Sequence, residues 1–287
     1  MNKIAVVLAV HNRKQLTDRF LASITKQSLD SYVVIVVDDG STDGTSEMIN
    51  EKYSDVQLLR GDGSLWWSAS TNMAIKYALQ EFNPDYICTM NDDTEADYHF
   101  LEELYKVAHT HPKSIVGCFS YDIKNPTNLL YDGSCVNWIT GRISEVNSDK
   151  AYNKNRNIID VTYYIGRGVL IPSDVFRQCG LYDAERFPQS WADNDLIFRA
   201  KRQGYKVLST RRAIQYIYHD ESTHLHLKKR LTINNYIKYL FLNQGGGNIL
   251  VYSKYVIRSY PWYGVPTSLV TGVISRVLGY WNPLLNL

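Results

Sequence analysis

The chain has few cysteines, and they lie far apart in the sequence. Four occur in 287 residues, without a Cys-x-x-Cys pair, so the sequence favours neither a zinc site nor a disulfide framework. A secretory signal is also missing, because the apolar run at residues 4–10 is too short and ends in polar residues. The cytoplasm is therefore the expected location.

Acidic residues are missing from the C-terminal part of the chain. Between Ser222 and Leu287 there are seven Lys or Arg and no Asp or Glu. The whole chain has 31 basic and 29 acidic side chains, so the residues before Ser222 hold 24 basic against 29 acidic. An acidic body argues against nucleic-acid binding. The basic, aromatic tail is typical of a membrane or partner surface.

Buried strands alternate with helical segments in the first part of the sequence. Residues 4–10 and 32–37 are apolar runs of strand length, and Phe20 and Ile24 recur at helical spacing between them. This order predicts βαβ crossovers and an α/β fold with a parallel sheet. Residues 1–120 are thus expected to form a nucleotide-binding half.

The pattern changes after this half. Residues 130–146 alternate apolar and polar side chains, and turns at Gly133 and Gly141 predict antiparallel hairpins. Residues 121–221 are expected to form a second half of the same domain. A soft domain boundary is expected near residue 220, so the domain spans residues 1–221.

Polar residues follow the strand expected at residues 86–90. Asn91, Asp92 and Asp93 would leave its carboxyl end, where open α/β sheets bind ligands. Oxygen ligands packed this closely suit Mg²⁺ or Mn²⁺ shared with substrate phosphates. The alternative is an Asx turn followed by a helix N-cap, without any metal. This stretch alone does not separate the two interpretations.

Several further motifs accompany these strand ends in a fixed order. They are His11-Asn12-Arg13, Val37-Asp38-Asp39-Gly40, Asn91-Asp92-Asp93-Thr94, Gly166-Arg167-Gly168, Gly180-Leu181-Tyr182-Asp183 and Trp191-Ala192-Asp193-Asn194-Asp195-Leu196. Together they resemble glycosyltransferase family 2, over about residues 3–220. The resemblance implies a GT-A fold: a Rossmann-like, mostly parallel sheet flanked by helices, with a small antiparallel region on the acceptor side.

The resemblance also implies a reaction, which is transfer of a sugar from a nucleoside-diphosphate sugar with inversion at the sugar carbon. The stretch from Leu65 to Trp67, followed by Asn72, is similar to the bacterial rhamnosyltransferase-like subgroup. That similarity implies a UDP- or dTDP-linked donor, such as dTDP-rhamnose, and a role in bacterial surface polysaccharide synthesis.

The resemblance assigns a donor site mainly to the first half of the domain. Asp39 would accept the ring N–H of a uracil or thymine, or would only close a turn before Gly40. Trp66 and Trp67 would wall the sugar pocket or pack in the core. Arg167 would pair with a phosphate or sugar hydroxyl, or lie at the surface. The other implied donor-side residues are Ala9, His11, Arg13, Asn72 and Asp92.

A divalent cation, Mn²⁺ or Mg²⁺, is implied by the same resemblance. Asp93 would coordinate it, and the ion would act as a Lewis acid on the diphosphate. Asn91 stands where many family members have an Asp, so the site carries less negative charge. His219, which follows a strand-like run, would complete the metal shell.

Asp193 is the expected general base. It would remove the proton of the acceptor hydroxyl as that oxygen attacks the sugar, and a helix N-terminus would keep it ionised. The alternative is plain N-capping of the helix expected at residues 193–203. Ala192 stands where the family usually has an acidic residue, which makes Asp195 a secondary candidate.

Two other functions compete with this one. A sugar-1-phosphate nucleotidyltransferase also combines a Rossmann-like half with Mg²⁺, but it would need a Gly-rich basic loop after the first strand. Residues 9–13 contain no glycine. A non-catalytic nucleotide-sugar-binding module is the other alternative, and the presence of Asp39, Asp93 and Asp193 argues against it.

Residues 222–287 predict a C-terminal helical appendage. Residues 263–281 have no charge except Arg276, but Pro266 and the central arginine argue against a membrane-spanning helix. The appendage would pack on the body, join a second subunit, or lie peripherally on the inner face of the cytoplasmic membrane. In the last case a glycan or lipid-linked acceptor would be met at the bilayer surface.

Overall fold

The central sheet is built around β1, Ile4–Val10, which is buried along nearly its whole length. It pairs in parallel with β2, Tyr32–Asp38, and with β4, Tyr86–Thr89. A strand covered on both faces needs apolar side chains at successive positions, and the sequence of β1 meets this need. The computed structural model describes residues 3–146, 156–218, 232–242 and 247–281.

The other strands of this sheet are β3 Gln57–Arg60, β5 Thr94–Ala96, β6 Ser114–Asp122, β7 Asn125–Tyr131, β10 Ile158–Asp160, β11 Val169–Pro172 and β12 Lys206–Ile217. Over the described residues the order is β10-β12-β6-β11-β4-β1-β2-β3, with β5 paired to β12 and β7 to β6. β1 to β4 are parallel, whereas β11 runs antiparallel between β4 and β6. The chain before β11 therefore arrives at the edge where β4 ends.

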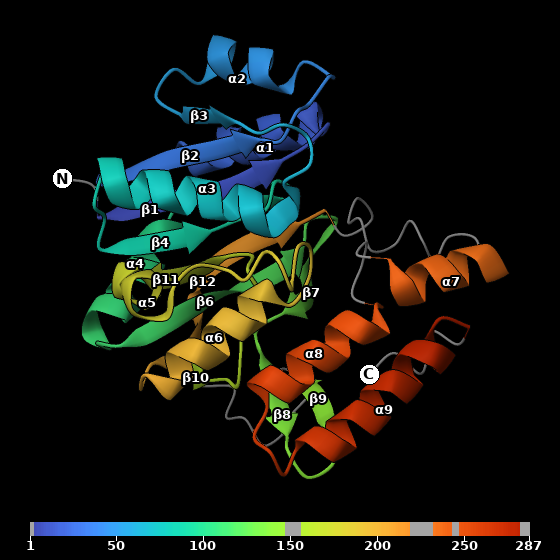
Figure 1. Cartoon of the computed structure of the whole chain (residues 1–287). Coiled ribbons are helices and arrows are strands. Elements are labelled where there is room, and N and C mark those ends of the chain that lie inside the picture. Colours follow the sequence, from blue (N-terminus) through green and yellow to red (C-terminus); the bar gives the residue numbers. More distant parts are fainter. Residues whose placement is uncertain (1–2, 147–155, 219–231, 243–246, 282–287) are drawn as a thin grey trace.

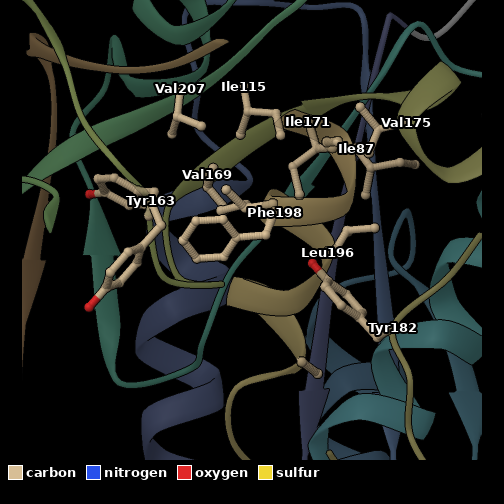
Figure 2. Close-up of a cluster of buried hydrophobic side chains, with 14 of the residues drawn as sticks. Ile87, Ile115, Tyr163, Val169, Ile171, Val175, Tyr182, Leu196, Phe198 and Val207 are labelled. Carbon is tan, nitrogen blue, oxygen red and sulfur yellow. The ribbon is translucent and has the colours of Figure 1, made fainter. Parts of the chain in front are cut away.

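Helices cover both faces of the sheet (Figure 1). They are α1 Lys14–Ile24, α2 Thr45–Lys52, α3 Trp66–Glu81, α4 Phe100–Thr110, α5 Ser173–Cys179 and α6 Ala192–Arg202. α3 and α6 contribute Ile75 and Leu196 to a buried cluster on one face, part of which Figure 2 shows. α1 and α4 bury Phe20 and Phe100 on the other face. The core thus forms one layer on each side of the sheet.

A small second sheet and three further helices lie beside the main sheet (Figure 1). The strands are β8 Ser134–Asn137 and β9 Arg142–Glu145, and the helices are α7 Ile233–Phe241, α8 Ile249–Ser259 and α9 Val265–Gly279. α8 packs on α6, and α9 packs on α8. Among the described helices, none has the length and apolar character needed to cross a membrane.

Most of this architecture follows the expectations from sequence. The parallel sheet, the antiparallel strands within residues 130–146 and the C-terminal helices are all present. One helix start differs: the sequence predicts a helix over residues 70–82, but α3 begins at Trp66. The cause is Asp39, whose carboxylate accepts the N–H groups of Leu65 and Trp66 and turns the chain earlier. The boundary expected near residue 220 lies outside the described residues.

A close approach in the core offers a test of the fold. A Cβ atom on Gly117, in β6, would overlap the ring of Tyr164, and both residues are buried. We expect Gly117→Ala to lower the free energy of unfolding by about 1–3 kcal/mol, the usual cost of overpacking. Urea denaturation would measure the change. Adding Tyr164→Leu should recover part of the loss, and a wild-type midpoint for Gly117→Ala would contradict this packing.

Candidate active site

Parallel strands end at one edge of the sheet and place polar residues there. β1 and β2 are in register with Val10 opposite Asp38, so His11 and Asp39 leave them side by side. The Nδ1 atom of His11 lies 2.5 Å from the carbonyl oxygen of Asp39. β4 lies parallel on the other side of β1, and Asn91 follows it past the same edge. These strand ends meet as the sequence predicts.

The carboxylate of Asp39 holds the loop that follows β3. Its Oδ1 accepts the N–H of Gly63 at 2.9 Å, and its Oδ2 accepts those of Leu65 and Trp66 at 3.0 and 3.2 Å. A carboxylate has about four lone-pair sites, so about one acceptor site remains for a further N–H donor. Three backbone N–H groups therefore fix the Asp39 carboxylate in place.

Asp92 is buried against α1. Its Oδ2 lies 3.3 Å from Nε of Arg13 and accepts a hydrogen bond from the Thr17 hydroxyl at 3.4 Å. Burial raises the pKa of Asp92 to about 7; the Arg13 guanidinium opposes this shift and the Asp93 carboxylate adds to it. Nη2 of Arg13 is buried without a hydrogen-bond partner among the described residues. Asp92 therefore orients an arginine that retains a donor for an anionic ligand.

Trp67 joins separate parts of the edge. Its indole Nε1 donates a hydrogen bond to Oδ1 of Asn91 at 3.2 Å. Its ring lies 5.2 Å from the ring of Tyr182, and a Cβ atom on Gly166 would be 2.7 Å from the indole. The indole thus reaches from the end of β4 to the loop that precedes β11.

Three other residues expected on the donor side differ in their exposure and in their contacts. Trp66 is 42% exposed at a positive φ of 58°, and Ala9 is half-buried in β1 opposite Val37. Asn72 donates to the carbonyl of Tyr182 at 2.8 Å and accepts its N–H at 3.0 Å. Asn72 therefore positions the Tyr182 loop, and its contact with the donor stays a prediction.

Two consecutive loop residues connect carboxylates from opposite sides of the site. The N–H of Gly166 donates to Oδ2 of Asp193 at 2.7 Å. Nη1 of Arg167 lies 3.6 Å from Oδ2 of Asp93, and Nε of Arg167 is buried without a hydrogen-bond partner in the part of the chain described. Since Gly166 and Arg167 are neighbours in the chain, Asp93 and Asp193 flank one short stretch of backbone.

Asp193 lies in the first turn of α6. Burial raises its pKa, although the N–H groups of Gly166 and Asn194 act in the opposite direction. Trp191, just before the helix, has a positive φ of 76°. Its ring stacks on that of Tyr255 in α8 at 4.8 Å. The C-terminal helices therefore support the turn that presents Asp193, and the raised pKa makes this carboxylate a stronger base than an exposed one.

Asp195, the secondary candidate for the base, pairs with two arginines. Its Oδ2 accepts a hydrogen bond from Nε of Arg199, and its Oδ1 accepts one from Nε of Arg258, both at 2.7 Å. The carboxylate is buried. Two guanidinium groups hold both oxygens, so Asp195 fastens α8 to α6.

Comparison with known proteins assigns the family. The model of glycosyl transferase family 2 matches residues 5–180, more than half of the chain. The chain belongs to glycosyl transferase family 2. The resemblance carried by the motifs is confirmed, and membership argues against the nucleotidyltransferase alternative.

Two relatives illustrate how distant this family 2 member is. It is 24% identical to the low-salt glycan biosynthesis hexosyltransferase of Haloferax volcanii over 180 residues, which are 60% of this chain and 54% of that protein. It is also 24% identical to the N-acetylglucosaminyl-diphospho-decaprenol L-rhamnosyltransferase of Mycobacterium tuberculosis over 222 residues, covering 70% and 71% of the two chains. The chain thus matches about half the length of the Haloferax protein.

A solved structure supports the expected GT-A architecture. The crystal structure of GalNAc-T7 with UDP, GalNAc and Mn²⁺ superposes with a TM-score of 0.60 at 14% sequence identity, and the match covers 98% of this chain and 56% of that one. Together with the family match, this confirms the mostly parallel sheet with flanking helices, and the C-terminal helices expected from the sequence are present.

The expected metal ligands are only partly assembled. The described residues contain no group of three His, Cys, Asp or Glu side chains arranged for a metal ion. Oδ1 of Asn91 accepts the Trp67 indole N–H, and His219 lies outside the described residues. Mg²⁺-type sites on phosphates need only one or two carboxylates, because phosphates and waters supply the other ligands. Asp93 therefore fits a cation that arrives with a diphosphate.

Sequence reasoning gave no role to Trp191, Tyr182 or Arg258. Trp191 and Tyr182 stand inside two of the motifs that carry the resemblance to the family, and this position was the available signal. Arg258 gave none, because its partner Asp195 is 63 residues away in the sequence. Such a contact emerges only once α8 packs on α6.

The raised pKa of Asp92 predicts a pH-dependent stability. The native state holds this proton more tightly than the unfolded chain, so the contribution of Asp92 to stability falls as pH rises from about 4 to about 7. Asn cannot titrate. We therefore expect the Tm of Asp92→Asn, relative to wild type, to increase between about pH 5 and pH 8. Asp55→Asn, at an exposed position, is the control, and a constant Tm difference for Asp92→Asn would contradict the shift.

Proposed function

We propose that this family 2 member is an inverting glycosyltransferase that transfers a sugar from a nucleoside-diphosphate sugar to an acceptor hydroxyl. One observation carries the proposal: Gly166 donates to Asp193 while Arg167 lies against Asp93. The adjacent residues Gly166 and Arg167 thereby bring together the carboxylate of Asp193, which is suited to proton removal, and the guanidinium of Arg167, which is suited to a diphosphate. Such a pairing is what a displacement between donor and acceptor needs.

The donor would occupy the edge formed by β1, β2 and β4. Asp39 retains about one acceptor site for the N–H of a uracil or thymine ring, which favours UDP- or dTDP-linked sugars. UDP in the GalNAc-T7 structure supports a uridine donor, and the mycobacterial relative, named as an L-rhamnosyltransferase, supports dTDP-rhamnose. The buried unpartnered nitrogens of Arg13 and Arg167 are suited to the diphosphate oxygens.

Asp193 would act on the acceptor. Its carboxylate takes the hydroxyl proton while the hydroxyl oxygen bonds to the anomeric carbon, and the bond from that carbon to the diphosphate breaks with its electron pair leaving on the nucleotide. Attack from the face opposite the diphosphate inverts the carbon. The hydrogen bonds from Gly166 and Asn194 fix the direction of the base, and Arg167 offsets the charge that develops on the leaving group.

A divalent cation, Mn²⁺ or Mg²⁺, would be held by Asp93 together with the donor phosphates. When bound, such an ion supplies Lewis-acid stabilisation of the departing diphosphate. Mn²⁺ in the GalNAc-T7 structure supports this assignment. Arg167, already beside Asp93, would contribute positive charge at the same place.

The acceptor is proposed to be a glycan or a lipid-linked sugar. The name of the mycobacterial relative includes a diphospho-decaprenol, and that of the Haloferax relative refers to glycan biosynthesis. Both support surface polysaccharide synthesis. We assign residues 1–221 to catalysis and residues 222–287 to a helical segment that also supports the acceptor side, through Tyr255 on Trp191.

The base assignment is tested by Asp193→Asn. Transfer should fall by about 10²–10⁴-fold, the usual contribution of a positioned base, while UDP and dTDP binding, followed by calorimetry, stays near wild type. Nucleotide release from a panel of UDP-, dTDP- and GDP-sugars measures transfer. In the wild type, the raised pKa of Asp193 should place the acidic limb of kcat above the usual range for Asp, with activity lost as pH falls.

Asp195→Asn is the matched control in the same helix. It should lower Tm, because it removes the partner of Arg199 and Arg258, but leave turnover per folded molecule largely intact. Near-full turnover of Asp193→Asn would show that another residue is the base.

The metal assignment predicts that cation and nucleotide bind together. Mn²⁺ alone should bind weakly, because Asp93 is the only carboxylate we assign to it among the described residues. Mn²⁺ should increase the affinity for UDP by about tenfold or more. Asp93→Asn should abolish that increase and keep the metal-free affinity for UDP, as measured by calorimetry. Equal UDP affinity with Mn²⁺ and with chelator in the wild type would remove Asp93 from a metal role.

A further inference from the structure

Helix α9 has its charge inside and its apolar side chains outside. Val270, Ile274 and Leu278 follow one another at intervals of four residues, and all are exposed, Val270 to 60%. The only charged residue of the helix, Arg276, points inward: its guanidinium lies 3.5 Å from the ring centroid of Tyr252 and 5.2 Å from that of Trp191. A helix at a water-exposed surface normally has the opposite arrangement.

Helix α7, beside α9, also exposes a stripe of apolar side chains. Ile233, Ile237 and Phe241 are exposed along one stripe. The two helices touch through Tyr236, whose ring centroid lies 5.1 Å from that of Tyr280, at the end of α9. Figure 1 shows α7 and α9 together at the side of the molecule away from the main sheet. The exposed apolar side chains of α7 and α9 therefore lie in one region of the surface.

The most exposed apolar side chains gather at the other end of α9. Trp262 is 84% exposed and Ile139, in the turn between β8 and β9, is 79% exposed. Trp138, beside Ile139, lies 4.8 Å from the ring of Tyr260. The hairpin turn thus packs against the residues that precede α9. We call the exposed apolar side chains of α7, α9 and this turn, together with Trp262, the outer face.

The charge around the outer face selects its partner. Between Ser222 and Leu287 the chain has no acidic residue, and Lys238 and Lys254 are exposed on α7 and α8. A second copy of the chain would bring the same positive charge to this face, and like charges oppose such contact. An anionic lipid surface offers both the apolar environment and the opposite charge.

We propose that the outer face lies on an anionic membrane surface, with α9 parallel to the bilayer and Trp262 and Ile139 inserted at its edge. The inference stands without the proposed reaction, since it depends only on exposure and charge. If the proposed function also holds, Trp191 connects the two. It contacts Arg276 of α9 and precedes Asp193 by two residues, so the helix that meets the lipid would contact the turn that carries the base.

Liposome flotation of the full chain tests the proposal without donor or acceptor. The probes are vesicles of phosphatidylcholine alone and of phosphatidylcholine with phosphatidylglycerol. The wild type should float with the anionic vesicles, and less so at high salt. Val270→Ser/Ile274→Ser should partition about tenfold or more weakly, because it removes apolar area from contact with lipid, with Tm unchanged. Tyr98→Ser, at an exposed aromatic residue on the body, should float like the wild type.

A second variant separates charge from apolar contact. Lys238→Glu/Lys254→Glu should lose the preference for anionic vesicles. The proposal is overturned if the wild type floats with neither vesicle, or if Val270→Ser/Ile274→Ser floats as well as the wild type. A third outcome also overturns it: the wild type never floats, and light scattering shows that it is a dimer that Val270→Ser/Ile274→Ser dissociates. The outer face would then join two copies of the chain. None of these outcomes bears on transfer, which Asp193→Asn tests separately.

Discussion

The short backbone stretch at Gly166 and Arg167 is the constraint on which the site depends. Its N–H fixes Asp193 and its guanidinium lies against Asp93. A Cβ atom at Gly166 would be 2.7 Å from the Trp67 indole and 3.2 Å from Cβ of Asp193, so a side chain there would separate the elements that meet. β11 makes the contact possible, because it enters antiparallel beside β4 and brings the preceding loop to the edge where β4 ends.

The C-terminal helices support the helix that carries Asp193. Arg258 of α8 holds the buried carboxylate of Asp195, and Tyr255 stacks on Trp191 at the turn into α6. The guanidinium of Arg276, in α9, also lies over the ring of Trp191. The helix that carries Asp193 is therefore supported on one side by the sheet and on the other by residues from the end of the chain. A surface that binds α9 would contact a segment that already packs against the helix carrying Asp193.

Local sequence patterns were enough to locate the strand ends. An apolar run that stops abruptly before Asp38 or before Asn91 marks the end of a buried strand, and parallel strands end at a common edge. That is why the α/β sheet and the meeting of these polar groups were predictable from sequence. The same reasoning did not predict the partners of Asn72 and Asp195. Both are polar residues within matching motifs, but each satisfies its hydrogen bonds with partners distant in sequence.

The sequence by itself determined the alternation of strands and helices, the family and the carboxylates at the sheet edge, because these depend on apolar periodicity and on residue type in short segments. Tertiary structure decided which carboxylates remain for chemistry. Arg199 and Arg258 form ion pairs with Asp195, and Arg13 forms one with Asp92. The N–H of Gly166 orients Asp193. It also decided that α9 turns Arg276 inward. The physical reason is common to all of these: burial makes an unpaired charge costly, so each charge takes the partner that packing brings near, whatever its distance in sequence.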